Sequence, residues 1–291
     1  MLNVVLPKGS LEAATLALFD DADLGVQRSS DVEYRASIDD PRVAGVRILR
    51  PQEIPRYVAD GLFDLGVTGR DWVEETSADV VTLGELAYSK TTGRGVRLVL
   101  AVAADDPAGS VAELRDGLRV HTEYPELTRR YFADHGLQAD VSLSYGATEA
   151  KVPDIADAVV ELTETGRALR AAGLRILDTV LASSTVLIAN RAAHQDAAKR
   201  RAMEQLHTLL DGALEARGKV LLKLNVEEGA LSRVLELLPA LKAPTVSKLS
   251  GGDAYAVESV VAKAEINTLI PALKEQGATG IIEIPIAKIV H

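Results

Sequence analysis

The sequence predicts an α/β protein made of two lobes followed by a smaller third domain. Short apolar runs alternate with helical patterns in two successive blocks up to residue 190, which is typical of parallel βαβ units. Glycine-bearing turns follow several of these runs, at the strand ends where open α/β sheets bind ligands. From residue 219 the order changes to strand, helix, two strands, helix and strand.

The first block opens with a strand at Leu2–Leu6 and a turn at Lys8-Gly9-Ser10, after which apolar residues recur at helical spacing. Further strands are expected at Glu33–Ile38, Val46–Leu49 and Leu65–Thr68. Helices are expected at Pro51–Asp60, which Gly61 ends, and from Gly69-Arg70-Asp71 onward.

The second block repeats the alternation. Its expected strands are Arg97–Ala103, Arg119–Thr122, Asp140–Leu143, Arg175–Ala182 and Thr185–Ala189. Its expected helices are Ser110–Arg115 and Pro125–His135, and a further strand, turn and helix occupy 157–172. Because the late strands can cross back to the first block, we expect two lobes around a cleft.

A long helix at Arg191–Arg217 should link the lobes to the third domain. There the expected strands are Lys219–Val226, Thr245–Leu249, Tyr255–Ala262 and Gly280–Ile284, and the helices are Glu228–Leu238 and Ile266–Gln276. This βαββαβ order is the ferredoxin-like plan. Small domains of this plan often sense amino acids, but a fold alone does not establish function.

Composition narrows the class of protein. The chain has 47% hydrophobic residues, no cysteine and a formal charge of −10, which argue for a globular protein without disulfides and against nucleic-acid binding. The amino terminus reads as a strand, and no apolar run approaches membrane-spanning length, so we expect a cytoplasmic protein with no membrane partner. Anion binding would then depend on locally clustered lysines and arginines.

The most informative segment runs from Asp157 to Leu169. An apolar strand with Asp157 and Glu161 leads into Thr163-Glu164-Thr165-Gly166 and then a helical pattern starting at Arg167. Such a turn offers backbone N–H groups and hydroxyls to a phosphate at a helix N-terminus, and nearby carboxylates suit ribose hydroxyls. The segment suggests a phosphoribosyl site, although an ordinary strand–turn–helix explains the same residues equally well.

Other turns carry candidate ligand contacts. Lys8 and Gly9 can meet a phosphate, although a capped helix start fits them too. Arg70, after Gly69, is well placed for an anion, while Asp71 also fits a helix cap. Glu149 can support a metal or a sugar hydroxyl, or be a solvated loop acid. The five histidines show no zinc-ligand spacing, and no hydrolase or dinucleotide motif is present.

Together these motifs resemble ATP phosphoribosyltransferase in its long form, in order along essentially the whole chain. The matching segments are Leu6–Leu11, Asp64–Asp71, Tyr124–Arg130, Glu149–Leu169 and, in the regulatory domain, Leu241–Ser247. The resemblance implies a periplasmic-binding-protein-like pair of lobes, with residues 1–95 and 183–215 in the first lobe and 96–182 in the second. It also implies an ACT-like regulatory domain at 216–291.

The family transfers the 5-phosphoribosyl group of phosphoribosyl pyrophosphate (PRPP) to N1 of ATP, and pyrophosphate leaves with Mg²⁺ bound to substrate phosphates. The resemblance implies that Thr163–Arg167 hold the 5′-phosphate and that Glu161, with Asp157, holds ribose hydroxyls. Lys8 and Arg70 would face the pyrophosphate or the nucleotide phosphates, with Gly9, Gly69, Asp71 and Glu149 among the substrate contacts.

In the long form the third domain binds L-histidine as an inhibitor and mediates a homo-oligomer, from dimer to hexamer. The residues that map to the effector pocket are Asn225, Leu241, Ala243, Thr245, Val260 and Gly280. Small or apolar residues suit a compact amino-acid pocket, and they equally suit a packed core.

The chain departs from the family pattern at three places. Ser10 stands where many relatives carry Arg, the segment Tyr88–Gly95 is longer than the usual crossover, and Ala168 replaces a common Thr.

Three alternative functions remain. A prephenate dehydratase would need a Thr-Arg-Phe motif where this chain has Thr128-Arg-Arg-Tyr-Phe132, a solute-binding receptor would need a signal peptide, and a catalytically inactive paralogue would lack intact site residues.

Overall fold

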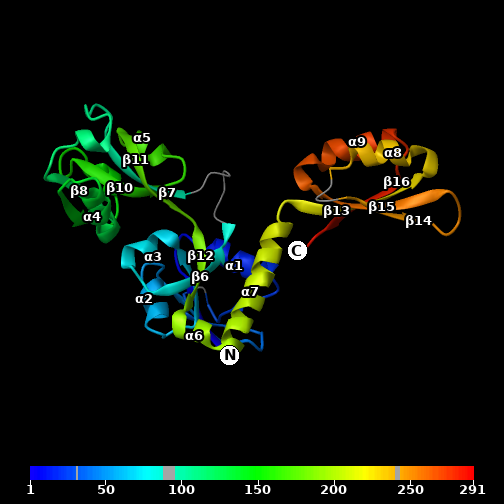
Figure 1. Cartoon of the computed structure of the whole chain (residues 1–291), viewed down its shortest axis with the longest axis horizontal. Helices are drawn as coiled ribbons and strands as arrows, with labels where there is room; N and C mark the ends of the chain where they lie inside the picture. Colours follow the sequence, from blue (N-terminus) through cyan, green and yellow to red (C-terminus); the bar gives the residue numbers. More distant parts are fainter. Residues whose placement is uncertain (31, 88–95, 240–242) are drawn as a thin grey trace. The chain divides into compact units, whose positions relative to one another are not determined.

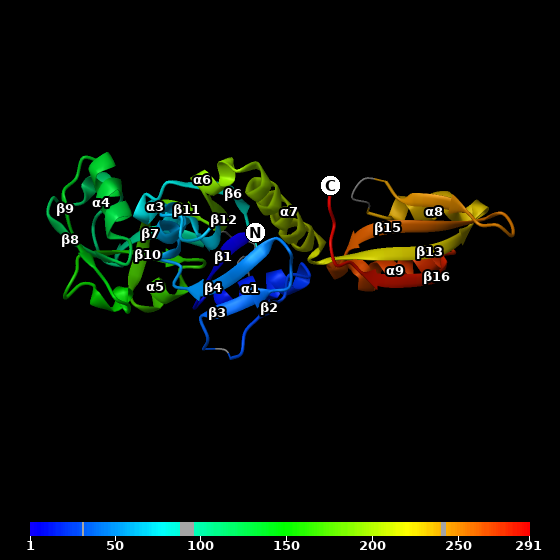
Figure 2. The ribbon, with the colours of Figure 1, turned by 90° about the horizontal axis from the view of Figure 1, so that it is seen from below.

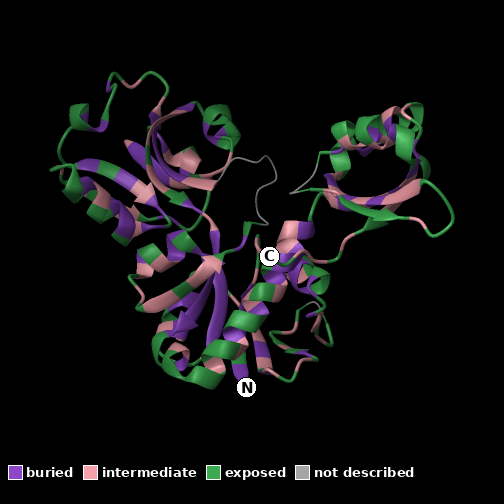
Figure 3. Cartoon of the chain, turned by 45° about the vertical axis from the view of Figure 1, so that its right-hand side comes forward, coloured by how far each residue is buried: buried purple, intermediate pink, exposed green. Residues whose placement is uncertain are grey.

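The computed structural model describes residues 1–30, 32–87, 96–239 and 243–291. The chain divides into two compact units, Met1–His207 and Thr208–His291. No helix in the described part of the chain combines the length and apolar character that crossing a bilayer requires. Buried positions concentrate along the strands of the first unit, as the purple ribbon in Figure 3 shows.

The first lobe is built on a sheet with the strand order β2-β3-β4-β1-β5-β12-β6. β1 runs parallel to β4 and β5, whereas β12 lies antiparallel between β5 and β6. β12 is a late strand that crosses back to the first block, in agreement with the prediction (Figure 1). The strands are β1 (Leu2–Pro7), β2 (Val26–Gln27), β3 (Arg35–Ile38), β4 (Val43–Leu49), β5 (Leu65–Gly69), β6 (Val80–Glu85) and β12 (Thr185–Asn190).

Helices cover this sheet because their apolar stripes match its buried strands. α2 packs Ile54 and Val58 against Val5 and Ile188. Gly66 permits this contact, since a Cβ there would lie 2.9 Å from Val58 and 3.0 Å from Ile54. The helices of this lobe are α1 (Glu12–Asp21), α2 (Ile54–Ala59) and α3 (Arg70–Thr76).

The second lobe has a mixed sheet with the order β11-β7-β10-β8-β9. β8 is parallel to β9 and β10, as expected for βαβ units, whereas β7 is antiparallel to β10 and β11, which the expectation of parallel units did not include. Leu98, Leu100, Phe132 and Val160 belong to its core. The elements are β7 (Val96–Ala103), η2 (Val111–Glu113), β8 (Leu118–Thr122), α4 (Pro125–Asp134), β9 (Ala139–Leu143), η3 (Thr148–Lys151), β10 (Ala158–Thr163), α5 (Arg167–Ala171) and β11 (Leu174–Ser183).

The helical stretch expected at Arg191–Arg217 is two helices, α6 (Arg191–Gln195) and α7 (Ala197–Ala216). The break is at Asp196, whose backbone is extended and whose carboxylate accepts the N–H groups of Ala198 and Lys199 at 2.9 Å. This side chain caps the second helix, because its oxygen satisfies amides that have no partner within the helix.

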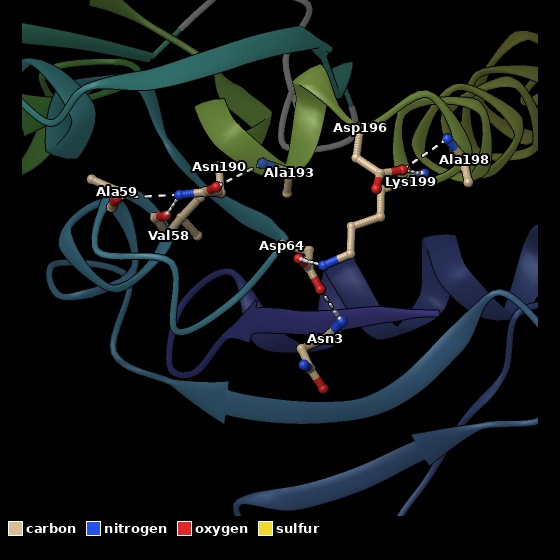
Figure 4. A network of polar contacts seen from close by, with 9 residues as sticks. All are labelled: Asn3, Val58, Ala59, Asp64, Asn190, Ala193, Asp196, Ala198 and Lys199. Carbon is tan, nitrogen blue, oxygen red and sulfur yellow. Dashed lines mark hydrogen bonds and ion pairs between the residues drawn. The ribbon is translucent and has the colours of Figure 1, made fainter.

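A polar network fastens these helices to the first sheet (Figure 4). Asn190 accepts the N–H of Ala193 at 2.8 Å and donates to the carbonyl of Val58. Asp64, which is 7% exposed, accepts from the Asn3 N–H and from the Lys199 ammonium at 2.7 Å. The start of α7 is therefore tied to the sheet by an ion pair with a buried carboxylate.

The second unit continues α7 into a ferredoxin-like domain, as expected. Its sheet has the order β14-β15-β13-β16, all neighbours antiparallel, with α8 and α9 packed on one face (Figures 1 and 2). Alternate residues of β13 (Val220, Leu222, Leu224 and Val226) are buried against those helices. The elements are β13 (Lys219–Glu227), α8 (Glu228–Leu237), β14 (Thr245–Lys248), β15 (Ala254–Ala262), η4 (Lys263–Glu265), α9 (Ile266–Glu275) and β16 (Thr279–Pro285).

Candidate active site

A cavity of about 230 Å³ lies in the first unit where the carboxyl ends of β1, β4, β5 and β10 converge. The first lobe contributes Ser10, Gly69, Asp71 and Trp72 to its lining, and the second contributes Glu123, Tyr124, Thr148 and Glu161. Ser183 and Ser184 line it from the link between β11 and β12. The cavity therefore lies where strand polarity places ligands in open α/β sheets.

Asp71 is buried at the junction of the two lobes, with 3% exposure. Its carboxylate accepts the Tyr124 hydroxyl at 2.7 Å and the Ser183 hydroxyl at 2.5 Å. The same carboxylate lies against Gly69, where a Cβ would come within 2.3 Å of Oδ1. Glycine is required there by this close approach, and Asp71 acts as a polar bridge between lobes.

Trp72 and Tyr124 form the aromatic wall of the cavity. Their rings stack with centroids 4.3 Å apart and planes 28° apart. Burial, followed by the negative charge of Asp71, raises the pKa of the Tyr124 hydroxyl well above its usual range, so this group remains a hydrogen-bond donor. No local pattern indicates this pairing, although Trp72 is the chain's one tryptophan.

Glu161 is the acid in the cavity whose environment indicates a ligand-binding role. Its Oε2 is buried and has no hydrogen-bond partner among the described residues. Burial, together with the negative charges of Glu149 and Glu123, raises its pKa to about 7, while Lys151 acts in the opposite direction. A half-buried carboxylate with an unused acceptor suits a positively charged or hydroxyl-bearing ligand.

Lys151 is a neighbour of the site that the sequence motifs do not single out. Its ammonium donates to Ser144 Oγ at 2.5 Å, and Ser144 in turn is 2.8 Å from the Thr148 hydroxyl. η3 carries Thr148, Glu149 and Lys151 together to the side of the cavity that Glu161 occupies. The position of Lys151 two residues after Glu149 is the signal that could have found it.

The threonine turn after β10 is closed by its own side chains. Gly166 has φ of +69° and donates its N–H to Thr163 Oγ1 at 2.9 Å, and the Arg167 N–H donates to Thr165 Oγ1 at 3.4 Å. A bound phosphate can replace these hydroxyls as the acceptor, and the hydroxyls can then donate to it. Because α5 has only five residues, its dipole adds little to such a site.

The two predicted cations of the first lobe, Lys8 and Arg70, are not among the residues that line the cavity. The Lys8 ammonium lies 4.5 Å from the Tyr34 ring centroid, and Gly9 adopts φ of +90° in the turn that follows. Arg70 is half exposed, and its guanidinium is 3.9 Å from Glu74. The roles of both cations toward substrate therefore stay predictions.

Asp157 is not brought into this site. It immediately precedes β10, whereas Glu161 is near the carboxyl end of that strand. Its carboxylate pairs with Arg119 at 2.9 Å and Arg115 at 2.6 Å, and these contacts lower its pKa. A carboxylate already neutralised by two guanidinium groups has little capacity left for a ribose, so Asp157 is not part of the site that we propose.

Four of the six predicted effector residues lie on the sheet of the second unit. Asn225, Val260 and Thr245 lie on β13, β15 and β14, on the sheet face opposite the buried residues of β13. A Cβ at Gly280 would come 3.4 Å from Asn225 Nδ2, so these two positions adjoin. Ala243 is exposed, and Leu241 falls outside the described residues, as does the 88–95 segment.

Comparison with known proteins decides the family. A family model described as ATP phosphoribosyltransferase matches residues 50–212, and one described as HisG, C-terminal domain matches 216–288. An ATP phosphoribosyltransferase of Nitratidesulfovibrio vulgaris is 48% identical over 290 residues, covering 99% of this chain and 98% of the relative. One of Solibacter usitatus is 47% identical, covering 100% of this chain and 99% of the relative. The chain belongs to the ATP phosphoribosyltransferase family.

The fold agrees with this membership. The ATP phosphoribosyl transferase (HisG:HisZ) complex from Thermotoga maritima superposes with a TM-score of 0.61 at 23% identity, covering 72% of this chain and 98% of that chain. Members of the ATP phosphoribosyltransferase family are pentosyltransferases of histidine biosynthesis, which confirms the enzyme class predicted from the motifs. The comparisons do not support the prephenate dehydratase alternative.

Proposed function

We propose that this chain joins the phosphoribosyl group of PRPP to N1 of ATP in the cavity between its lobes. The main support is Glu161, which lines that cavity two residues before the threonine turn and whose buried Oε2 has no hydrogen-bond partner among the described residues. Residues 163–167 are not among those that line the cavity, so in this proposal the ribose lies beside Glu161 and its 5′-phosphate extends to the adjoining turn.

The reaction breaks the bond between ribose C1 and the pyrophosphate oxygen, and the N1 lone pair of adenine forms the new bond to C1. Positive charge develops on the ribose ring as pyrophosphate leaves. In this proposal the Glu161 carboxylate accepts hydrogen bonds from the ribose hydroxyls and stabilises the positive charge on the ribose ring. Residues Thr163 to Arg167 hold the 5′-phosphate. No protein nucleophile is needed.

Magnesium fits this acidic surrounding. Burial, followed by the charges of Glu149 and Glu123, raises the pKa of Glu161, whose Oε2 has no partner among the described residues, so this group of acids favours a nearby cation. Across the described residues, no group of three or more His, Cys, Asp or Glu side chains is arranged to hold a metal by itself. We therefore propose that substrate phosphates supply most ligands, with Glu149 and Glu161 nearby. When bound, Mg²⁺ would neutralise charge on the leaving pyrophosphate.

The nucleotide and pyrophosphate are assigned to the first lobe. Lys8 and Arg70 are cations beside the turns that follow β1 and β5, and Gly9, Gly69 and Asp71 shape those turns. Their charges suit phosphate groups that extend beyond the cavity. Ser10 lines the cavity where many relatives carry Arg, so it would contribute only a hydroxyl.

Regulation by L-histidine through the second unit is part of the proposal, as is a cytoplasmic homo-oligomer from dimer to hexamer. Its support is the ferredoxin-like fold of that unit and its match to the family's C-terminal domain. Histidine can inhibit only by binding the active and inactive states with different affinity.

The test is an ultraviolet assay with ATP, PRPP and Mg²⁺, because alkylation at N1 changes the adenine spectrum. We expect turnover by the wild type, a loss of about 100-fold in kcat for Glu161→Ala, and little change for Asp157→Asn. Wild-type activity in a folded Glu161→Ala protein would refute the role of Glu161. Absence of wild-type turnover would favour a catalytically inactive paralogue.

A further inference from the structure

Helix α4 of the second lobe begins without a cap of its own. Pro125 occupies its first turn, and the preceding residue, Tyr124, accepts no hydrogen bond from the helix through its side chain in the described structure. The first amides of a helix have no partner inside it, and leaving them unsatisfied in a buried place is costly. The partners for α4 must come from elsewhere.

Glu75 of the first lobe supplies them. It is 8% exposed, and its Oε1 accepts the N–H of Glu126 at 3.0 Å while Oε2 accepts the N–H of Leu127 at 2.8 Å. Both carboxylate oxygens thus cap α4 from a helix 51 or 52 residues away in sequence. The negative charge also lies at the positive end of the α4 dipole.

The reverse contact caps the end of α3. Ser77 ends that helix with φ of +49°, and the Glu74 carbonyl lies in its last turn. The Arg130 guanidinium, from α4, donates to Ser77 Oγ at 2.7 Å and to the Glu74 carbonyl. Each helix therefore satisfies backbone or side-chain groups at one end of the other, across the junction of the lobes.

The cavity wall lies beside these two caps. Asp71, Trp72 and Glu75 come from the same short helix and all contact the start of α4: Asp71 and Trp72 hold Tyr124, and Glu75 holds the next two amides of the helix. Tyr124 therefore has its ring, hydroxyl and following backbone fixed by the first lobe. A change in the angle between lobes would break these contacts together.

We propose that Glu75 and Arg130 are positioning residues for phosphoribosyl transfer, acting as reciprocal helix caps that set the lobes at the angle where both line one cavity. The inference rests on the proposed function, since it assumes that substrates contact both lobes. Neither residue needs to touch a substrate. Loss of either cap lowers the population of the productive arrangement, and apparent affinity falls with that population.

The test compares Glu75→Gln and Arg130→Gln with the control Glu126→Gln. The Glu75→Gln substitution keeps the side-chain shape but presents an NH₂ group to one of the two amides, whereas Glu126→Gln removes an equal charge from the same helix end and retains its backbone donor. We expect faster hydrogen exchange at the amides of residues 126 and 127 in Glu75→Gln. We also expect kcat/KM for both substrates to fall by about tenfold in each test variant, with the control unchanged.

The outcomes separate positioning from simple stabilisation. Faster amide exchange with unchanged kcat/KM in a folded Glu75→Gln protein would overturn the proposal, as would unchanged exchange. If Arg130→Gln leaves kcat/KM unchanged, the proposed role of Arg130 as the cap of α3 is wrong. A wild type that does not turn over ATP and PRPP would refute the proposed function itself. If the wild type does turn them over, a failed prediction counts only against the roles of Glu75 and Arg130.

Discussion

At the level of single residues, Asp157 and Glu161 lie four positions apart but have opposite electrostatic environments. Asp157 is neutralised by Arg115 and Arg119, and its pKa is lowered. Glu161 is half buried, keeps Oε2 unpartnered among the described residues, and has a pKa of about 7 because of burial and neighbouring acids. Of these two acids, only Glu161 has an acceptor without a partner among the described residues, so we propose that environment rather than residue type makes it the ligand-binding acid.

This environment predicts how stability depends on pH. The folded protein binds a proton at Glu161 more tightly than the unfolded chain does, so the associated stability is present below pH 4.5 and lost as pH rises through about 7. Glu161→Gln removes the charge. At pH 8 we expect the ligand-free variant to be about 1–2 kcal/mol more stable than wild type, with solvent screening taken into account.

Thermal unfolding of both proteins between about pH 5 and pH 8 measures this difference. The gap in Tm should narrow as the pH falls. A constant gap across that range would show that Glu161 carries no unusual pKa in the free protein.

Among the structural elements, the turn after β10, which we propose holds a phosphate, has a defined backbone. Gly166 occupies the left-handed region with φ of +69°, and a Cβ there would lie 3.0 Å from Arg170 Nη1 and 3.1 Å from Ile176 Cδ1. Thr163 holds the Gly166 amide in the turn. The turn is thus formed without ligand, which reduces the ordering cost of binding a phosphate.

Gly166→Ala should therefore damage PRPP binding. The new side chain costs about 1 kcal/mol in this conformation and disturbs Arg170, so we expect KM for PRPP to rise about fivefold or more, and more than KM for ATP. Gly173→Ala is the matched control, because Gly173 has φ of +76° and no described atom within 4 Å of its added Cβ. Steady-state kinetics with each substrate varied would decide. Equal effects of both substitutions would mean that the turn does not hold PRPP.

Across the molecule, the chain joins a catalytic unit to a ferredoxin-like unit through one helix. The boundary between units falls inside α7, whose first turn is held by the Asp64–Lys199 ion pair and the Asp196 cap. A conformational change in the second unit can reach the catalytic unit through this helix. Allosteric coupling also requires two states of the protein that bind the effector with different affinity.

The proposed effector site gives a prediction at this level. Asn225→Ala removes an amide next to Gly280 on the open sheet face. We expect the histidine concentration for half-inhibition to rise about tenfold, because a hydrogen bond to a charged ligand is worth about 1.5 kcal/mol. Turnover without histidine should not change. Thr268→Ala, on the exposed surface of α9, is the control. Inhibition that is identical in wild type and Asn225→Ala would remove Asn225 from the site.

Local patterns in the sequence were enough to predict most elements, the ferredoxin-like order of the second unit and the family, because apolar periodicity, glycine turns and ordered motifs involve residues close in the chain. The same patterns point to Glu161, which lines the cavity. Other features depend on long-range contacts: Asp157 pairs with Arg119, 38 residues away, and Glu75 caps a helix at Leu127, 52 residues away. The energy of those contacts depends on burial and geometry that appear only when the lobes have folded, so no local pattern encodes them.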